Sequence, residues 1–532
     1  MACFSSVRLV SFVALPLLVG ACTSFRAEDQ PSPTTAKPDD PAVPDGGPSV
    51  TGTPDRGIQI VVGDPKATAF VMQGGSLALP VKLTRRQSST GDVDVTVAHL
   101  PADVTADPLT IKTGSSEGTL TLRAKATSTQ GGPVALEIGA VEKGPTGAGT
   151  TTKLSAFVRG GRGALDTTFG DKGSVLHVYG GGSQSTFLDA KTLRDGSILV
   201  SAKVRSNSVL SRFTSAGVLD PTFAAATGGT TVLISSQGNT RVGAYEPASP
   251  AKGFIYALES GGFKPTLFHL NLDGTPDLGF NGTGKVTIDD GLANGHGVEL
   301  VVLPDGKALV LLTHASGSGF AAVSRWNSDG TIDPTYGNAG TCQLPSQAAR
   351  MIPRPGGGVL VLTAAVLATV HGCTSAGMLD VMVGGAPDYS LSAPNAVDFT
   401  NTADGGMAVL AIEAGQTTHA MWSRFNTSLV KNTSIGILGD VPVRFPEAST
   451  INAQDDDGML VAASINSEFK VVRYLPTGKE DPDFGTAGVA TFNVGDTNGS
   501  HLVKLVPQPD GRFVAIGSND NGFDAAILRF WP

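Results

Sequence analysis

Between residues 57 and 159, apolar and polar residues alternate in several short runs. Gly-Gly and Gly-Ser turns separate these runs at intervals of roughly ten residues. The clearest runs are Ser76–Leu83, Asp92–Val97, Thr119–Ala126 and Val134–Ile138. A period of two places every second side chain on one buried face, so these runs are predicted to be β-strands. About seven short strands in ~100 residues predict a β-sandwich over residues 57–160.

The segment HLPADVTADPLTI (His99–Ile111) resembles a segment common in bacterial immunoglobulin-like domains. Residues 57–160 contain no Cys pair and no Trp, so the resemblance is to the Ig-like architecture and not to a true antibody domain. The next segment, RGGRG (Arg159–Gly163), is interpreted as a hinge. An RNA-binding function of this segment is less favoured because it occurs only once.

Residues 161–532 repeat a tight turn followed by an apolar strand, as in PDGKALVLL (Pro304–Leu312). The turn occurs seven times, at Gly196, Gly253, Gly306, Gly357, Gly405, Asp457 and Gly511. A second motif follows each turn, and its seven copies read SRF, FHL, SRW, HGC, SRF, VRY and LRF. Each unit of about 50 residues has room for four short strands, which is the content of one propeller blade.

A third motif reads LDTTFGDKG (Leu165–Gly173), IDPTYGNAG (Ile332–Gly340) and EDPDFGTAG (Glu480–Gly488). Together the three motifs resemble the delta-60 repeat family of bacterial proteins. The resemblance covers residues 161–532 and is weaker in the second, fourth and fifth repeats. It implies a β-propeller, in a family that usually has no assigned reaction.

The two ends of this region are complementary. The chain stops at LRFWP, where the third motif is due to follow, and the region begins with that missing motif. We therefore expect an all-β chain whose seven-bladed β-propeller is closed by its N-terminal strand, with six or eight blades as the alternatives. Asp220, Asp277, Asp333 and Asp481 recur at one position of the repeat and are interpreted as structural residues.

The amino terminus is typical of an exported lipoprotein. An apolar stretch, Leu9–Leu18, is too short to span a membrane and ends in LVGAC. This ending resembles a lipobox, which implies a signal peptide over residues 1–21 and lipidation of Cys22. The alternative is an ordinary signal peptide in which Cys22 has no function. Residues 22–56 are rich in Pro, Thr and Ser and predict a disordered tether.

The remaining sequence features limit the compartment and the partners. Thr23 follows the lipobox where Asp would mark inner-membrane retention, so the outer membrane or the cell surface is favoured. In an oxidising envelope, Cys342 and Cys373 form a disulfide or remain as two buried thiols. The net charge of −9 and the absence of a basic stripe exclude nucleic acid as a partner, and we expect a monomer.

No nucleophile elbow, H-E-x-x-H, C-x-x-C or EF-hand loop is present, so no catalytic residue, metal or cofactor is expected. The residues ten positions before the turns are expected at one mouth of the propeller channel. The predicted ligand-binding residues there are His296, Gln347, Asn395, Glu447 and His501. Alternatively, they are ordinary polar starts of inner strands. A metal bound by His296, His501 and Glu447 is disfavoured, because blades three and seven are not neighbours.

The sequence therefore predicts a lipid-anchored protein of the bacterial cell envelope. Its propeller is interpreted as a non-catalytic binding or scaffolding module for an envelope protein or glycan. The alternative is an envelope enzyme, a lyase or hydrolase of polysaccharide or peptide, with its site at the channel mouth.

Overall fold

The computed structural model describes residues 57–532 apart from short segments. These are residues 65–67, 87–88, 145–146, 148, 180–184, 235–237, 248–251, 261–263, 290–294, 315–319, 355, 364–366, 381–388, 395, 414–418, 495–499 and 520–523. The described residues contain no α-helix and one short 3₁₀ helix, η1 (Ala225–Thr227), so the prediction of an all-β chain is confirmed.

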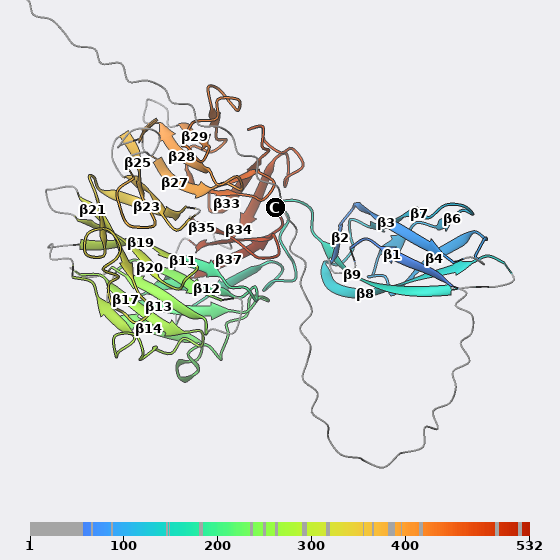
Figure 1. Ribbon diagram of the computed structural model, residues 1–532, viewed down its shortest axis with the longest axis horizontal. Coiled ribbons are helices and arrows are strands. Elements are labelled where there is room, and N and C mark those ends of the chain that lie inside the picture. Colours follow the sequence, from blue (N-terminus) through green and yellow to red (C-terminus); the bar gives the residue numbers. More distant parts are fainter. Residues whose placement is uncertain are drawn as a thin grey trace, which may run out of the picture. The chain divides into compact units, whose positions relative to one another are not determined.

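Residues 58–159 form two sheets (Figure 1). The first sheet is antiparallel and has the order β1 (Ile58–Val62), β3 (Ser76–Arg85), β7 (Glu117–Ala124), β5 (Val104–Ala106). The second has the order β2 (Ala69–Met72), β9 (Gly149–Arg159), β8 (Gly131–Glu142), β4 (Val93–Ala98), β6 (Leu109–Ile111), and only its β2–β9 pair is parallel. The four runs of alternating residues correspond to β3, β4, β7 and β8.

One hydrophobic core lies between these two sheets. Alternate residues of β3, such as Val81, face inward together with Leu120 and Leu122 of β7. Leu136 and Ile138 of β8 belong to the same buried cluster, although they come from the other sheet. The period-two pattern therefore reports one buried face in each sheet, as expected for half-buried strands.

The described part of residues 174–530 forms seven four-stranded antiparallel sheets. The first sheet contains β11 (Ser185–Thr192), β12 (Ile198–Val204), β13 (Asn207–Phe213) and β14 (Thr230–Ile234). The second contains β15 (Thr240–Tyr245), β16 (Phe254–Glu259), β17 (Thr266–Asn271) and β18 (Lys285–Thr287). The third contains β19 (Gly295–Val302), β20 (Ala308–His314), β21 (Ala321–Trp326) and β22 (Thr341–Leu344).

The fourth sheet contains β23 (Ala348–Pro353), β24 (Val359–Thr363), β25 (Leu367–Cys373) and β26 (Tyr389–Pro394). The fifth contains β27 (Ala396–Asn401), β28 (Met407–Glu413), β29 (His419–Phe425) and β30 (Asp440–Pro442). The sixth contains β31 (Ala448–Ala453), β32 (Met459–Ile465), β33 (Glu468–Tyr474) and β34 (Val489–Asn493). The seventh sheet has the order β35 (His501–Pro507), β36 (Phe513–Ser518), β37 (Ala525–Phe530), β10 (Ser174–His177). The two strand motifs read from the sequence are the second and third strands of these sheets.

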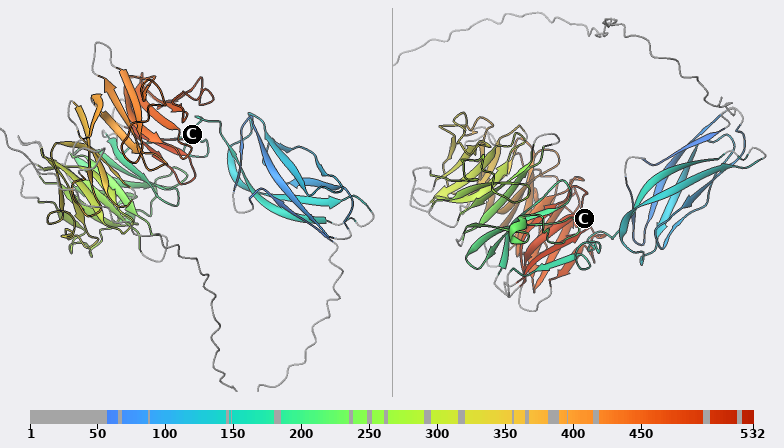
Figure 2. Two further views of the ribbon diagram at one scale, coloured as in Figure 1. Left: turned by 45° about the horizontal axis from the view of Figure 1, so that its top comes forward. Right: turned by 90° about the horizontal axis from the view of Figure 1, so that it is seen from below.

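The first strands of the seven sheets contact one another in a closed cycle. Each of β11, β15, β19, β23, β27 and β31 touches the first strand of the next sheet, and β35 touches β11 again. Figures 1 and 2 show the sheets arranged in sequence order around this centre. Apolar residues fill the spaces between neighbouring sheets, so each sheet covers a face of the next.

The seventh sheet contains both ends of this region. β10 pairs with β37, from Ser174 opposite Leu528 to His177 opposite Ala525. The contacts extend upstream, because the Gly163 N–H donates to the Trp531 carbonyl at 2.6 Å. Gly163, the last residue of RGGRG, is thus held to the C-terminal end of the repeat region. Gly163 is held in the turn that the last repeat lacks, with a positive φ of 74° that glycine adopts without strain.

A repeated ion pair joins neighbouring sheets. Third-strand arginines pair with an aspartate eight positions later, in Arg212–Asp220, Arg325–Asp333 and Arg473–Asp481. The guanidinium also reaches the next sheet, where Arg212 donates to the Leu272 carbonyl and Arg325 to the Ser375 carbonyl, each at 2.7 Å. In the second sheet, His269 replaces the arginine, and its Nδ1 lies 3.0 Å from Asp277. The recurring aspartates thus have structural partners, as their interpretation required.

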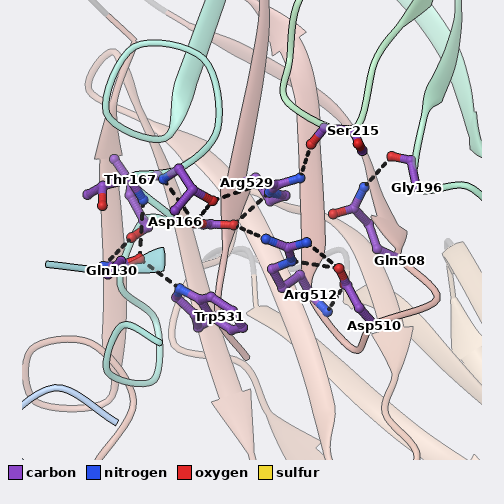
Figure 3. Close-up of polar contacts among 12 residues, drawn as sticks. Gln130, Asp166, Thr167, Gly196, Ser215, Gln508, Asp510, Arg512, Arg529 and Trp531 are labelled. Atoms are coloured by element: carbon purple, nitrogen blue, oxygen red, sulfur yellow. Dashed lines mark hydrogen bonds and ion pairs between the residues drawn. The ribbon is translucent and has the colours of Figure 1, made fainter. Parts of the chain in front are cut away.

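At the junction of the two ends, the same ion pair forms between residues far apart in sequence (Figure 3). Arg529 Nε donates to Asp166 Oδ2 at 2.8 Å, and Arg512 pairs with the same oxygen. Arg529 also donates to the Ser215 carbonyl of the first sheet at 2.5 Å and lies over the Phe169 ring. Asp166 has no exposed surface, so its charge depends on these two arginines.

Gln130, from the loop before β8, contacts this junction as well. Its side-chain amide donates to the Leu165 carbonyl at 3.1 Å, and its oxygen accepts the Trp531 indole N–H at 3.0 Å (Figure 3). The Trp531 ring lies 5.8 Å from the ring of Phe157 on β9 and 6.4 Å from the ring of Phe70 on β2. The C-terminal Trp is thereby buried, and the amide of Gln130 satisfies its polar atom.

A disulfide links two sheets elsewhere in the cycle. Cys342 on β22 of the third sheet is bonded to Cys373 on β25 of the fourth, and both side chains are buried. This bond closes a loop with a sequence separation of 31. The fourth sheet lacks the arginine of the repeated ion pair, because Gly372 occupies that position. The disulfide therefore joins the same two sheets as Arg325, which donates from the third sheet to the Ser375 carbonyl of the fourth.

We expect Asp166→Asn to lower the free energy of unfolding by about 3 kcal/mol, because it removes the ion-pair partner of the buried Arg529, whereas Arg512 keeps Asp510. Denaturant unfolding of the purified protein measures this. The matched control is Asp171→Asn, since Asp171 is exposed in the following turn and its loss has no such cost. Equal stability of the two variants would contradict the assigned role of the pair.

We expect the double variant Cys342→Ala, Cys373→Ala to lose about 4 kcal/mol of stability, since a disulfide that closes a loop of this length restricts the unfolded chain by about that amount. The unfolding midpoint in the presence and absence of a reducing agent provides the test. A reducing agent should lower the midpoint of the parent protein and leave that of the variant unchanged.

Candidate functional site

The first strands of the seven sheets line a cavity of about 270 Å³, here called the central cavity. Every one of these strands contributes to the lining, and β23, β27, β31 and β35 contribute most of it. One residue of each strand defines a ring around the cavity. In strand order the ring is Asp189, Arg241, Glu299, Arg350, Asp398, Thr450 and Lys504.

β-Bulges position these ring residues. The pairing of first and second strands shifts register immediately before Asp189, Glu299, Arg350, Asp398, Thr450 and Lys504. A bulge places two residues opposite one and redirects the side chain that follows. Only β15 pairs without a shift. Six sheets therefore use the same local irregularity to direct a residue into the cavity.

The ring alternates in charge. From Asp189 to Asp398, acidic and basic residues alternate, with three acids and two bases. Thr450 is uncharged, and the third base, Lys504, lies next to Asp189 in the cycle. The ring has no net charge when all six groups are ionised. Opposite charges therefore lie side by side on neighbouring strands, which is the arrangement that lowers the cost of burying them.

Lys504 and Asp189 form the shortest ion pair of the ring. Lys504 Nζ lies 2.6 Å from Asp189 Oδ1, and the Val242 N–H donates to Oδ2 at 2.9 Å. Burial acts to raise the pKa of Asp189, but the attraction of Lys504 and Arg241 outweighs it and holds that pKa below its ordinary value. Burial acts to lower the pKa of Lys504, and Asp189 and Glu299 together keep it above its ordinary value.

The other two charge pairs are longer. Arg241 Nε lies 3.5 Å from Glu299 Oε1, and this guanidinium donates to the carbonyls of Val298 and Leu188 at 3.1 and 3.2 Å. Arg350 Nε lies 3.8 Å from Asp398 Oδ1, outside hydrogen-bond distance. Both arginines thus leave the carboxylates beside them incompletely bonded.

The two acids of these longer pairs have pKa values above their ordinary ones. Burial raises the pKa of Glu299 above its ordinary value, and Arg241 offsets this only in part. Burial likewise raises the pKa of Asp398 against the opposing attraction of Arg350 and the hydrogen bonds to Asp398 Oδ2. Those bonds come from Thr450 Oγ1 at 2.9 Å and from the Ile451 N–H at 3.0 Å.

The predicted mouth residues lie just before this ring. His296 and His501 are exposed near or at the starts of β19 and β35, and Gln347 and Glu447 are exposed immediately before β23 and β31. Asn395 lies outside the described residues. No hydrogen bond or ion pair among the described residues joins His296, Glu447 and His501, and no group of three His, Cys, Asp or Glu there is placed to hold a metal.

The charged ring was missed because strict alternation places it on the wrong face. Five ring residues follow a predicted mouth residue by three positions, as Glu299 follows His296. In a regular strand, an odd spacing points the two side chains in opposite directions. The bulge removes that rule. A usable pattern was present, since the position seven before the turn is charged in Asp189, Glu299, Arg350, Asp398 and Lys504.

A second hollow of about 700 Å³ lies beside the edge strand β34. Its lining includes Arg162, Arg444 and Lys470. Each of these cations has a carboxylate partner, namely Asp481 at 3.0 Å, Glu480 at 3.3 Å and Glu468 at 3.1 Å, respectively. Because these charges are neutralised locally, the second hollow offers less to a ligand than the central cavity does.

No model of a protein family matches the chain, and no curated protein sequence matches it. Among solved structures, it is similar to apo prolyl oligopeptidase B from Galerina marginata (12% identity, TM-score 0.32), with 63% of this chain aligned. The alignment spans 56% of that enzyme, little more than half of its length.

The chain is also similar to domains 4–9 of the surface layer protein SbsC, with 12% identity and a TM-score of 0.15; the alignment covers 89% of this chain and 82% of that one. A further similarity is to a protein of unknown function from Porphyromonas gingivalis W83, with 13% identity and a TM-score of 0.16; the alignment covers 48% of this chain and 91% of that one. No helix among the described residues is long and apolar enough to cross a membrane.

We expect Lys504→Met to lower stability at neutral pH by about 2 kcal/mol, because it leaves the buried Asp189 carboxylate with a weakened countercharge. The pKa of Asp189 is lower in the folded protein than its value of about 3.9 in the unfolded chain, so ionised Asp189 stabilises the fold at pH values above about 3.9. This stabilisation is lost as the pH falls from that value through the pKa of the folded protein. The gap between parent and variant should therefore narrow below about pH 4.

Unfolding curves of both proteins across this pH range provide the measurement. Lys252→Met is the control, since Lys252 is exposed just before β16 and has no ion-pair partner among the described residues. A gap that stays constant with pH would show that Lys504 contributes only by packing.

Proposed function

We propose that residues 161–532 form a seven-bladed β-propeller of the delta-60 repeat type, closed by its N-terminal strand, and that residues 57–160 form an Ig-like β-sandwich. The closed cycle of first strands, the β10–β37 pairing and the recurring Arg–Asp pair support the propeller. The single core between two sheets supports the sandwich.

The protein is a lipoprotein of the bacterial envelope in this proposal, anchored through Cys22 at the outer membrane or cell surface. The LVGAC sequence supports the anchor. The buried disulfide between Cys342 and Cys373 supports export, because such bonds persist in oxidising compartments. The partners are therefore the membrane, through the lipid, and an envelope protein or glycan, through the propeller.

The propeller is a binding or scaffolding module and not an enzyme. The observation that carries this proposal is the central ring, whose six charged groups pair with one another instead of converging on one open position. A catalytic centre needs a base or nucleophile within hydrogen-bond distance of a bound substrate atom. In the ring, the nearest charged neighbour of each carboxylate is a cation on an adjacent strand, at 2.6 to 3.8 Å, and the arrangement is suited to recognising polar groups.

The lipid anchor is tested by expressing the full chain and the Cys22→Ser variant in a bacterial host with radiolabelled palmitate. We expect label and membrane association for the parent chain only. Cys3→Ser is the control, because Cys3 lies in the predicted signal peptide and should not affect labelling of the mature protein. Membrane association of unlabelled Cys22→Ser protein would contradict the anchor.

The binding function is tested by cross-linking the full-length protein in intact envelopes and purifying it under denaturing conditions. We expect one or a few envelope components to be enriched at least tenfold over a cross-linked control lipoprotein. If the purified protein instead cleaves envelope polysaccharide or peptide, and Glu299→Gln abolishes the cleavage, the enzyme alternative replaces the proposal.

A further inference from the structure

The loosely paired side of the ring offers both a cation and an anion to a ligand. Arg350 has one hydrogen bond among the described residues, to the carbonyl of Ala349 at 3.3 Å, and its carboxylate neighbour Asp398 is 3.8 Å away. Glu299 on the adjacent strand has Arg241 at 3.5 Å as its ion-pair partner. Most of the donors of Arg350 and the acceptors of Glu299 are therefore available inside the cavity.

Ser449 of β31, two strands from Arg350 in the cycle, adds a neutral polar group to the cavity lining. Ser449 is one of the residues that line the cavity, and its hydroxyl is buried with no hydrogen-bond partner among the described residues. A buried hydroxyl without a partner is costly, and a bound polar molecule removes that cost. The opposite side of the ring differs, because Lys504 and Asp189 already satisfy each other at 2.6 Å.

Charge balance limits the kind of ligand. The ring is neutral, so a ligand with a net charge would leave one buried charge without compensation. A molecule with one ammonium and one carboxylate group adds no net charge to the ring. Its carboxylate matches the fork of free donors on Arg350, and its ammonium matches Glu299, so two long contacts are replaced by short charge-assisted hydrogen bonds.

The size and position of the cavity agree with a small ligand. A volume of about 270 Å³ corresponds to roughly nine water molecules, which suits an amino acid or a dipeptide. The exposed residues His296, Glu447 and His501 lie three positions before their ring residues, about 10 Å along the strands. They mark the side from which a ligand would enter.

We propose that the central cavity binds a small zwitterion, such as a free amino acid or a dipeptide, with its carboxylate on Arg350 and its ammonium on Glu299. This inference rests on the proposed binding function and specifies its ligand class. It places recognition three residues deeper than the mouth and requires no covalent step.

Isothermal titration calorimetry of the purified full-length protein tests the proposal, with L-alanyl-L-alanine and L-alanine as probes. We expect at least one of them to bind. N-acetylation or C-terminal amidation should weaken the binding at least tenfold, because each removes one charge. Arg350→Gln and Glu299→Gln should weaken it to the same degree. Arg444→Gln, a matched arginine change in the second hollow, should leave it within twofold.

Several results would overturn the proposal. Absence of binding by both probes does so, as does equal binding of the blocked and free forms, or binding that is unaffected by Arg350→Gln. If a ring variant fails to fold, as shown by its melting curve, the blocked and free probes on the parent protein still decide. Glucose serves as an uncharged comparison probe: if it binds and neither zwitterion does, the zwitterion proposal is rejected and the binding function stands. Turnover of any probe rejects the non-catalytic binding function.

Discussion

The ion pair between Arg529 and Asp166 is the interaction on which the cyclic part of the structure depends. In the first, third and sixth sheets the equivalent arginine and aspartate are eight positions apart, as in Arg212 and Asp220, whereas here they are separated by 363 positions. Closing a loop of that length costs about 3 kcal/mol more than closing the short one. The junction therefore forms at low cost only when the intervening sheets have already brought the two ends together.

Burial makes this junction selective for one register. Asp166 is fully buried and is shared by Arg529 and Arg512, so a shift of β10 along β37 would leave charges without partners. The Gln130 amide bonds to the adjacent backbone and to Trp531, which couples a loop of the N-terminal sheets to the same point. A single buried polar cluster thus fixes where the end of the chain meets the start of the repeats.

The central ring follows the same principle in a different place. Charges from successive first strands alternate in sign, so each sheet satisfies its neighbour. The pairs are unequal, however, because Lys504 contacts Asp189 closely while Arg350 and Asp398 do not meet at hydrogen-bond distance. This inequality separates a tightly paired part of the ring from a loosely paired part, and the proposed ligand is assigned to the loosely paired part.

The sequence predicts the elements of this fold well and its site less well. The turns and the strands after them follow local rules, so Gly306 marks the turn before β20, and β21 contains the motif SRW. The ring depends on β-bulges, which change the direction of Glu299 and its equivalents without a distinct residue type to announce them. The contact of Gln130 with Trp531 spans 401 positions and has no local pattern at all.

The junction between the two ends of the repeat region is tested most directly by thermal unfolding of a chain that lacks residues 164–178. The unfolding is measured with and without a synthetic peptide of those residues. The account predicts that the deletion destroys the single cooperative transition of the repeat region and that the peptide, added in trans, restores it by pairing with β37. A deleted chain that melts like the intact protein would contradict closure by a shared sheet.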